Sequence, residues 1–269
     1  MSSESREGWD LRESGPADAD HTVLLLPGGL CTAVFFDDLM AEPKLSEAPI
    51  RLVAATPPGY GGTPPPEDLT MENYARLAGK LAAGLGCEIV VGHSLGGNVT
   101  LEMVAAGEFS GSVILLSPSF SREDEFKELG MLNRIGRVPG VGYLAYAVML
   151  KMIGKMMKGS FPPARHDALV AEMKKSDPRV CRQQVRRYFE YLDRHGSLVS
   201  RLCESGAKAW VVFGDRDEIG LTDEERRGLD ACQSVTMVTV PDASHMVMTD
   251  QPARTAELLF EVVTGIAER

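Results

Sequence analysis

The sequence has no apolar run long enough to cross a membrane. In its 269 residues the longest apolar stretches, such as Ile89–Val91 and Val113–Leu116, fall far below the roughly 20 residues that a transmembrane helix needs. The polar N-terminus also lacks the hydrophobic segment of a signal peptide. We therefore expect a cytoplasmic protein without a membrane partner, and we expect residues 1 to about 7 to be disordered.

The sequence contains few cysteines, and its basic residues are outnumbered by its acidic residues. The cysteines are scattered and form no C-x-x-C pair; they are Cys31, Cys87, Cys181, Cys203 and Cys232. In a reducing cytosol this pattern predicts free thiols, and neither a disulfide framework nor a structural zinc or other metal site. A formal net charge of −10, from 28 Lys+Arg and 38 Asp+Glu, argues against nucleic acid as a partner because nucleic acids attract basic surfaces.

The composition is ordinary for a globular protein, but the charge is unevenly distributed. With 44% hydrophobic and 25% charged residues, the chain can bury a sizeable core. Residues 121–205 contain 16 Lys+Arg against 10 Asp+Glu, whereas the remainder contains 12 against 28. A basic middle between acidic flanks suggests an insertion. We predict a core of residues 1–120 and 206–269 and a helical lid, or cap, of residues 121–205.

The flanks alternate between apolar runs and helical patterns. Continuous apolar runs bounded by turn residues are typical of strands covered on both faces. The runs are Thr22–Leu26, Arg51–Ala54, Glu88–Val91, Ser112–Leu116, Ala209–Phe213 and Val235–Val240. Helical patterns at Met71–Gly84 and Asn98–Ala106 separate them, which predicts an α/β fold with a doubly wound, mostly parallel sheet. The middle contains helical patterns only: Lys127–Leu132, Gly142–Lys158, Pro163–Lys175 and Arg179–Asp193.

One motif points to a nucleophile. The pattern G-x-S-x-G at Gly92–Gly96 directly follows an apolar strand and precedes a helical pattern. In this context the serine sits on a strained strand-to-helix turn, and the glycines let strand and helix approach closely. The N–H of Leu95 would then point to the place where an oxyanion forms. We interpret Ser94 as the nucleophile; the alternative is a glycine-rich turn with a capping serine.

Three segments resemble a known family. They are L-L-L-P-G-G-L at Leu24–Leu30, P-G-Y-G-G-T at Pro58–Thr63 and G-H-S-L-G-G at Gly92–Gly97. Together they are similar to the α/β-hydrolase superfamily, in particular to its lid-bearing, monomeric, esterase-like serine hydrolases. The resemblance runs from about Trp9 to the C-terminus and is weak across residues 121–205. It implies the α/β-hydrolase fold, a small-molecule substrate and no cofactor.

The base and its acid are expected in two later loops. A serine hydroxyl needs a neighbouring base near neutral pH. His245 follows the last predicted strand in a loop similar to the family's histidine loop, so we expect it to be the general base rather than a packed loop residue. The family's G-x-x-D after the preceding strand selects Asp217, with Asp215 as the competitor. The order Ser94, Asp217, His245 is that of the fold.

The first loop departs from the family pattern. The family often has His-Gly where this chain has Pro27-Gly28. The resemblance implies that the backbone N–H of Gly29 is the second oxyanion donor beside that of Leu95. Leu30 is the alternative donor.

Weaker patterns suggest pocket residues. Met149, Met152 and Met156 recur at helical spacing in the predicted lid. They can pack the lid against the core, form a deformable wall for an acyl or ring group, or belong to a membrane-surface helix. Leu30 and Tyr60 are further candidates for the lining, and Tyr60 can equally be a packed loop aromatic.

A serine at position 94 favours acyl transfer to water. Family members that open epoxides or displace halide carry an aspartate there, so the sequence does not look like either kind. We predict a serine hydrolase that cleaves a carboxylic ester of a small or medium apolar substrate. Alternatives are cleavage of a C–C bond, lactone or thioester by the same residues, or a ligand-binding protein without turnover on the same scaffold.

Overall fold

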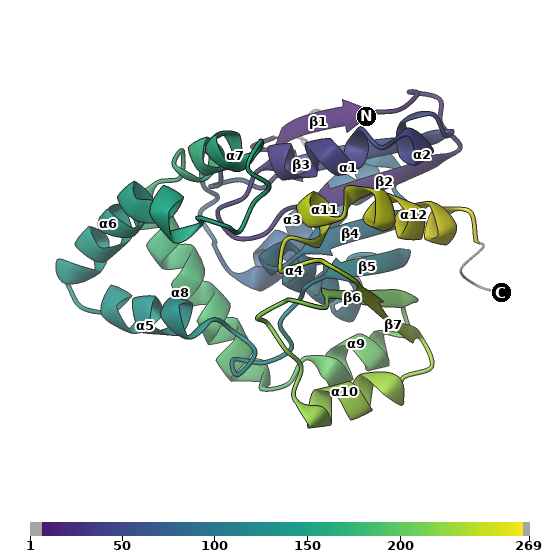
Figure 1. Cartoon of the computed structure of the whole chain (residues 1–269). Helices are drawn as coiled ribbons and strands as arrows, with labels where there is room; N and C mark the ends of the chain where they lie inside the picture. Colours follow the sequence, from purple (N-terminus) through teal and green to yellow (C-terminus); the bar gives the residue numbers. More distant parts are fainter. Residues whose placement is uncertain (1–6, 266–269) are drawn as a thin grey trace.

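The computed structural model describes residues 7–265, in which one seven-stranded sheet forms the centre. Its order is β1-β3-β2-β4-β5-β6-β7 (Figure 1). The strands are β1 (Asp10–Ser14), β2 (His21–Leu26), β3 (Ile50–Thr56), β4 (Ile89–His93), β5 (Ser112–Leu116), β6 (Ala209–Gly214) and β7 (Val235–Val240). Every neighbouring pair is parallel except β1–β3. The predicted α/β fold with a mostly parallel sheet is confirmed. The expected disorder of residues 1 to about 7 concerns residues that lie almost entirely outside the described range.

Helices cover both faces of the sheet, which explains why its strands are continuously apolar. Along β2, Val23 and Leu25 are buried in the core on one face, and Leu24 and Leu26 in the core on the other. The first face is covered by α1 (Asp37–Met40), α2 (Pro43–Ser46), α11 (Val247–Asp250) and α12 (Pro252–Val263). The second is covered by α3 (Met71–Leu85), α4 (Leu95–Ala105), α9 (Val199–Ser205) and α10 (Asp223–Asp230).

The edge strand β1 was not predicted. Its sequence, Asp-Leu-Arg-Glu-Ser, is polar, and most of it is exposed. It pairs antiparallel with β3, and the ion pair between Glu13 and Arg51 joins the two strands. Because β1 buries little apolar surface, hydrophobic periodicity carries no signal for it.

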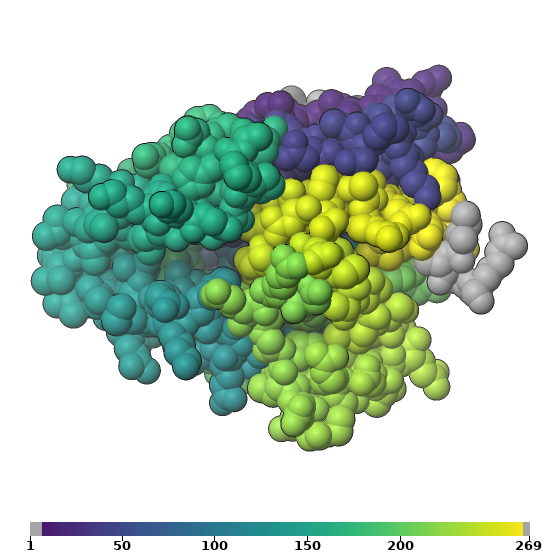
Figure 2. Space-filling model, viewed as in Figure 1, coloured from purple at the N-terminus to yellow at the C-terminus, as the bar shows by residue number. Residues whose placement is uncertain are grey.

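Four helices between β5 and β6 project beyond the sheet (Figures 1 and 2). They are α5 (Lys127–Gly136), α6 (Val141–Met156), α7 (His166–Met173) and α8 (Pro178–His195), and we call them the α5–α8 segment. The next helix, α9, falls inside the range 121–205 but packs against α4 in the layer that covers the sheet. The division into a core and a lid of residues 121–205 stays a prediction.

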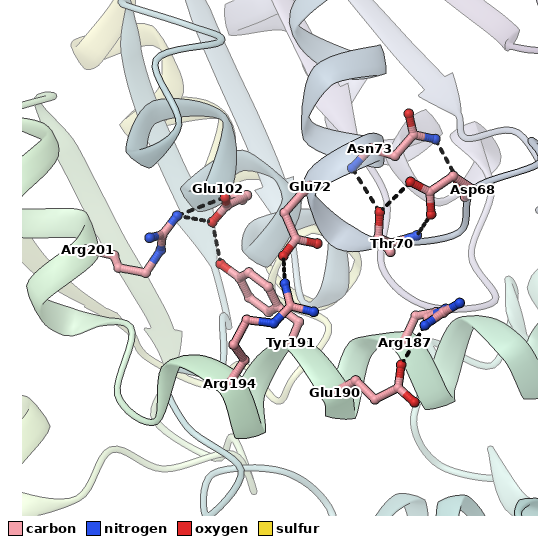
Figure 3. Close-up of polar contacts among 10 residues, drawn as sticks. All are labelled: Asp68, Thr70, Glu72, Asn73, Glu102, Arg187, Glu190, Tyr191, Arg194 and Arg201. Atoms are coloured by element: carbon pink, nitrogen blue, oxygen red, sulfur yellow. Dashed lines mark hydrogen bonds and ion pairs between the residues drawn. The ribbon is translucent and has the colours of Figure 1, made fainter.

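Buried polar contacts tie α8 and α9 to α4 (Figure 3). Glu102 of α4 is only 3% exposed. Tyr191 of α8 donates a hydrogen bond to its carboxylate over 2.8 Å, and Arg201 of α9 donates to both of its oxygens over 2.8 and 2.6 Å. Since α4 begins directly after Ser94, this anchor holds the helix on which the nucleophile turn depends.

The expectation of five free cysteines is wrong for one pair. Cys203 of α9 and Cys232, which follows α10, form a disulfide with Cα atoms 5.7 Å apart. The other three cysteines are free. Two cysteines separated by 29 residues have no recognisable spacing, and only the packing of α9 beside α10 brings them together. The cytoplasmic location, which was inferred from the missing membrane span and signal peptide, stays a prediction.

Candidate active site

Ser94 lies on a strained turn between β4 and α4. Its backbone has φ 50° and ψ −120°, a conformation that costs a residue with a side chain on the order of 1–3 kcal/mol. The flanking glycines make the turn possible. A Cβ on Gly92 would overlap the carbonyl oxygen of Gly96, and one on Gly96 would overlap that of Leu26. The Ser94 N–H donates to the carbonyl oxygen of Leu116 over 2.8 Å, so the turn stays attached to β5.

The loop after β2 packs against this turn. A Cβ built on Gly28 would lie 3.1 Å from the Ser94 Cβ and 2.8 Å from His93 Nδ1, so only glycine fits there. Leu30, in the same loop, adopts a positive φ of 63°. Leu95 is the first residue of α4, and its N–H therefore has no acceptor within the helix. The loop after β2 therefore lies directly beside the Ser94 turn.

His245 pairs with a buried carboxylate. Its Nδ1 lies 3.2 and 3.4 Å from the two carboxylate oxygens of Asp217, whose side chain is 1% exposed. The backbone N–H of Ile219 donates to the same carboxylate over 2.9 Å. Burial alone would raise the pKa of Asp217, but the hydrogen bond from His245 and its charge outweigh burial and lower that pKa. The competitor, Asp215, is exposed and makes no contact with the imidazole among the described residues.

A second histidine links the base to the nucleophile turn. No hydrogen bond joins Ser94 to His245 within the described part of the chain. Instead His93 Nε2 donates to the backbone carbonyl oxygen of His245 over 2.9 Å, and the two ring centroids are 5.0 Å apart. Catalytic hydrogen bonds of unliganded enzymes are often long and shorten when substrate binds.

His93 is held neutral by its surroundings. Burial, followed by the nearby charge of His245, lowers its pKa to about 3. Because a carbonyl oxygen only accepts, the single proton of this neutral ring stays on Nε2. In the sequence His93 is part of the motif at Gly92–Gly96, which assigns it no role. Its position directly before the nucleophile was the one available signal.

An aromatic ring from the entrance to the α5–α8 segment covers the imidazole. Phe126, directly before α5, meets His245 edge-to-face, with ring centroids 5.2 Å apart. No local pattern in the sequence marks Phe126, because its partner is 119 positions away. The chain that leaves β5 therefore returns over the candidate base.

The pocket candidates divide into two groups. Leu30 and Met149 are partly buried, and both pack against the apolar cluster on the inner face of α6. Met152 and Met156 are 47% and 55% exposed on the outer face of that helix, and their part in a pocket stays a prediction. Tyr60 is buried against an aromatic ring of α3, which fits its reading as a packed loop residue.

No metal site is apparent in the described residues. Between residues 7 and 265, no three His, Cys, Asp or Glu side chains gather in a way that could hold a metal ion. The candidate groups are the hydroxyl of Ser94, the imidazole of His245, the carboxylate of Asp217 and the N–H of Leu95 at the start of α4. This set suits nucleophilic attack on a carbonyl carbon with proton transfer.

Comparisons with known proteins identify the family and the fold. Residues 23–258 match the family model described as alpha/beta hydrolase family. No curated protein matches the sequence.

Solved structures show the same fold at low identity. A thermophilic esterase from Thermogutta terrifontis is 18% identical, with a TM-score of 0.73 over 96% of this chain and 93% of its own. An esterase from Exiguobacterium antarcticum is 15% identical, with a TM-score of 0.75 over 95% of each chain. An N-acyl homoserine lactonase complexed with N-hexanoyl homoserine is 18% identical, with a TM-score of 0.69 over 95% of this chain and 92% of its own.

Proposed function

Because the chain belongs to the alpha/beta hydrolase family, we propose that it hydrolyses carboxylic esters through an acyl-enzyme on Ser94. The observation that carries the proposal is the pairing of His245 with the buried Asp217, beside a strained serine turn. Nδ1 of the imidazole faces the carboxylate, which leaves Nε2 as the nitrogen that can accept the serine proton.

The proposed reaction has two halves. Ser94 Oγ attacks the ester carbonyl carbon while its proton moves to His245 Nε2, and Asp217 stabilises the resulting imidazolium. The N–H groups of Leu95 and of Gly29 or Leu30 bind the oxyanion. The tetrahedral intermediate collapses, and the imidazolium gives its proton to the departing alcohol. Water, deprotonated by the same imidazole, then attacks the acyl carbon and releases the acid and the free serine.

We also propose that the α5–α8 segment acts as a lid and forms part of the substrate pocket. Phe126 against His245, and Leu30 and Met149 beside the cluster on α6, support an apolar lining close to the reacting groups. Such a lining suits the acyl or alcohol part of a small or medium apolar ester.

A lactone is the second candidate substrate. It is a cyclic ester, so the same attack and the same oxyanion donors would open it, and one similar structure is that of a lactonase. At this identity the likeness supports the fold rather than the substrate, and open-chain esters remain the first proposal.

The test is a panel of aryl esters from short to long acyl chains, assayed with the parent protein and with Ser94→Ala. Loss of the nucleophile should lower kcat by on the order of 10⁶-fold, and an organophosphonate should label the parent at Ser94 only. A folded parent protein that neither turns over any ester or lactone nor becomes labelled would refute the proposal. Ligand binding that survives in Ser94→Ala, with no turnover in the parent, would support a binding protein instead.

A further inference from the structure

Exposed apolar side chains are concentrated on one part of the surface. Among the described residues, all the large hydrophobic side chains that are well exposed lie on α5, on α6 or between them. They are Met131, Val138, Val141, Tyr143, Leu144, Val148, Met152 and Met156. This region forms the end of the molecule farthest from the sheet (Figures 1 and 2). We call it the α5–α6 patch. Contiguous apolar surface on a soluble protein marks an interaction site.

Helix α6 is apolar on opposite sides. Tyr146, Leu150 and Ile153 are buried and pack the inner face against the rest of the protein. Leu144 and Val148, which follow one another at helical spacing, are 61% and 46% exposed on the outer face. A surface helix that packs against the protein on one side is expected to carry polar residues on its other side. The outer face of α6 therefore lacks a partner in the described structure.

The charges of the patch are positive except for Glu128 in the first turn of α5. From residue 129 to residue 166 the chain contains no Asp or Glu, although 38 of its residues are acidic. The patch carries exposed cations that make no ion pair or side-chain hydrogen bond with any described residue. They are Arg134, Arg137, Lys151, Lys155 and Lys158. An apolar face bordered by unpaired cations, on a chain of net charge −10, points to an anionic partner.

We propose that the α5–α6 patch docks on an anionic lipid surface. Its apolar side chains would enter the boundary between headgroups and acyl chains, and its cations would meet the lipid phosphates. No helix within residues 7–265 has both the length and the apolarity to span a bilayer, so α6 would lie along the surface. This inference goes beyond the proposed ester hydrolysis, and it departs from the expectation of no membrane partner.

A second copy of the chain suits the patch less well. In a two-fold symmetric dimer the same surface meets itself, so the cations of one copy would face those of the other. Like charges brought together in this way oppose association. An anionic surface pairs with the same cations favourably.

The experiment measures co-sedimentation of the full-length protein with vesicles. One set contains phosphatidylcholine alone, and the other includes about one third phosphatidylglycerol. We expect partitioning into the anionic vesicles only, weakened by added salt. Each lysine near such a surface strengthens partitioning roughly fivefold, so Lys151→Gln with Lys155→Gln should lower the partition coefficient about 30-fold. Leu144→Ser should lower it about tenfold by removing inserted apolar surface.

A matched control separates local from overall charge. Lys80 on α3 and Arg226 on α10 are exposed and lie outside the patch, so Lys80→Gln with Arg226→Gln makes the same change in net charge. This variant should partition like the parent. Ser94→Ala should also partition like the parent, so a failure of the proposed chemistry and a failure of docking give different results.

Three outcomes would overturn the proposal. The first is no binding to anionic vesicles by folded parent protein. The second is an equal loss of binding in the patch variant and in the control variant. The third is a concentration-dependent dimer that Leu144→Ser disrupts, without vesicle binding by the parent, which would assign the patch to a second copy.

Discussion

His93 provides the sharpest test of how the candidate site is held together. Replacing it with phenylalanine keeps a ring of similar size but removes the Nε2 donor, so the His245 carbonyl oxygen loses the hydrogen bond that it accepts over 2.9 Å. A buried acceptor without a partner costs about 1–3 kcal/mol. The histidine loop should shift, and a displacement of about 1 Å at a catalytic base can lower kcat about 100-fold. We expect kcat to fall about 10- to 100-fold with KM nearly unchanged.

The conservative variant His93→Gln is the control. Its side-chain amide carries an N–H donor at about the reach of Nε2, so it should recover most of the lost kcat. Steady-state kinetics on a short aryl ester, with circular dichroism to establish folding, measures both variants. Equal losses in His93→Phe and His93→Gln, or parent-like kcat in His93→Phe, would refute the proposed role of this hydrogen bond.

The same residue makes stability depend on pH. Burial lowers the pKa of His93 from 6.5 to about 3, so between these values the unfolded chain binds the proton and the folded protein does not. Stability must therefore rise with pH across this window and fall as the solution is acidified. When the pH falls from 7 to 4, the free energy of unfolding decreases in both proteins. The decrease in His93→Phe should be about 3 kcal/mol smaller than in the parent, as measured by denaturant titration. An equal decrease in the free energy of unfolding of the parent and of His93→Phe would contradict the assignment of this pH dependence to His93.

Three further predictions concern the acid, the buried anchor and the disulfide. Asp217→Asn should lower kcat by about 10⁴-fold with little change in thermal stability, because the imidazole loses its orienting charge; a small kinetic effect would point to another acid. Arg201→Met should lower the free energy of unfolding by about 3–5 kcal/mol, because it leaves Glu102 buried with less compensation; adding Glu102→Gln should recover part of this loss. Reducing the disulfide should lower the free energy of unfolding by about 3–4 kcal/mol, given the 29-residue separation; a parent insensitive to reductant would show that it contributes nothing.

Local sequence patterns were sufficient where the structure depends on near neighbours. The parallel strands and the helices that cover them follow from apolar runs and helical periodicity, because strands buried on both faces must be apolar at every position. The turn at Ser94 is equally local. Gly92 and Gly96 are required by contacts within the strand–turn–helix unit and with the adjacent loop. The polar edge strand β1 was missed because pairing with β3 does not require buried side chains.

Other features depend on contacts between distant segments. Periodicity placed Met149, Met152 and Met156 on one helix but could not assign its faces, because α6 is apolar on opposite sides. No sequence pattern near Cys203 predicts its disulfide bond to Cys232.

By itself the sequence determined the fold class, the position of the serine turn and the order of the three residues proposed to act with it. These depend on short-range sterics and on which runs can be buried. The tertiary structure showed that the carboxylate of Asp217, which the family resemblance had selected, meets His245. It alone decided that His93 holds the histidine loop and that one face of α6 stays exposed. Each of these depends on where segments far apart in the chain come to lie, and packing sets that position where no local pattern records it.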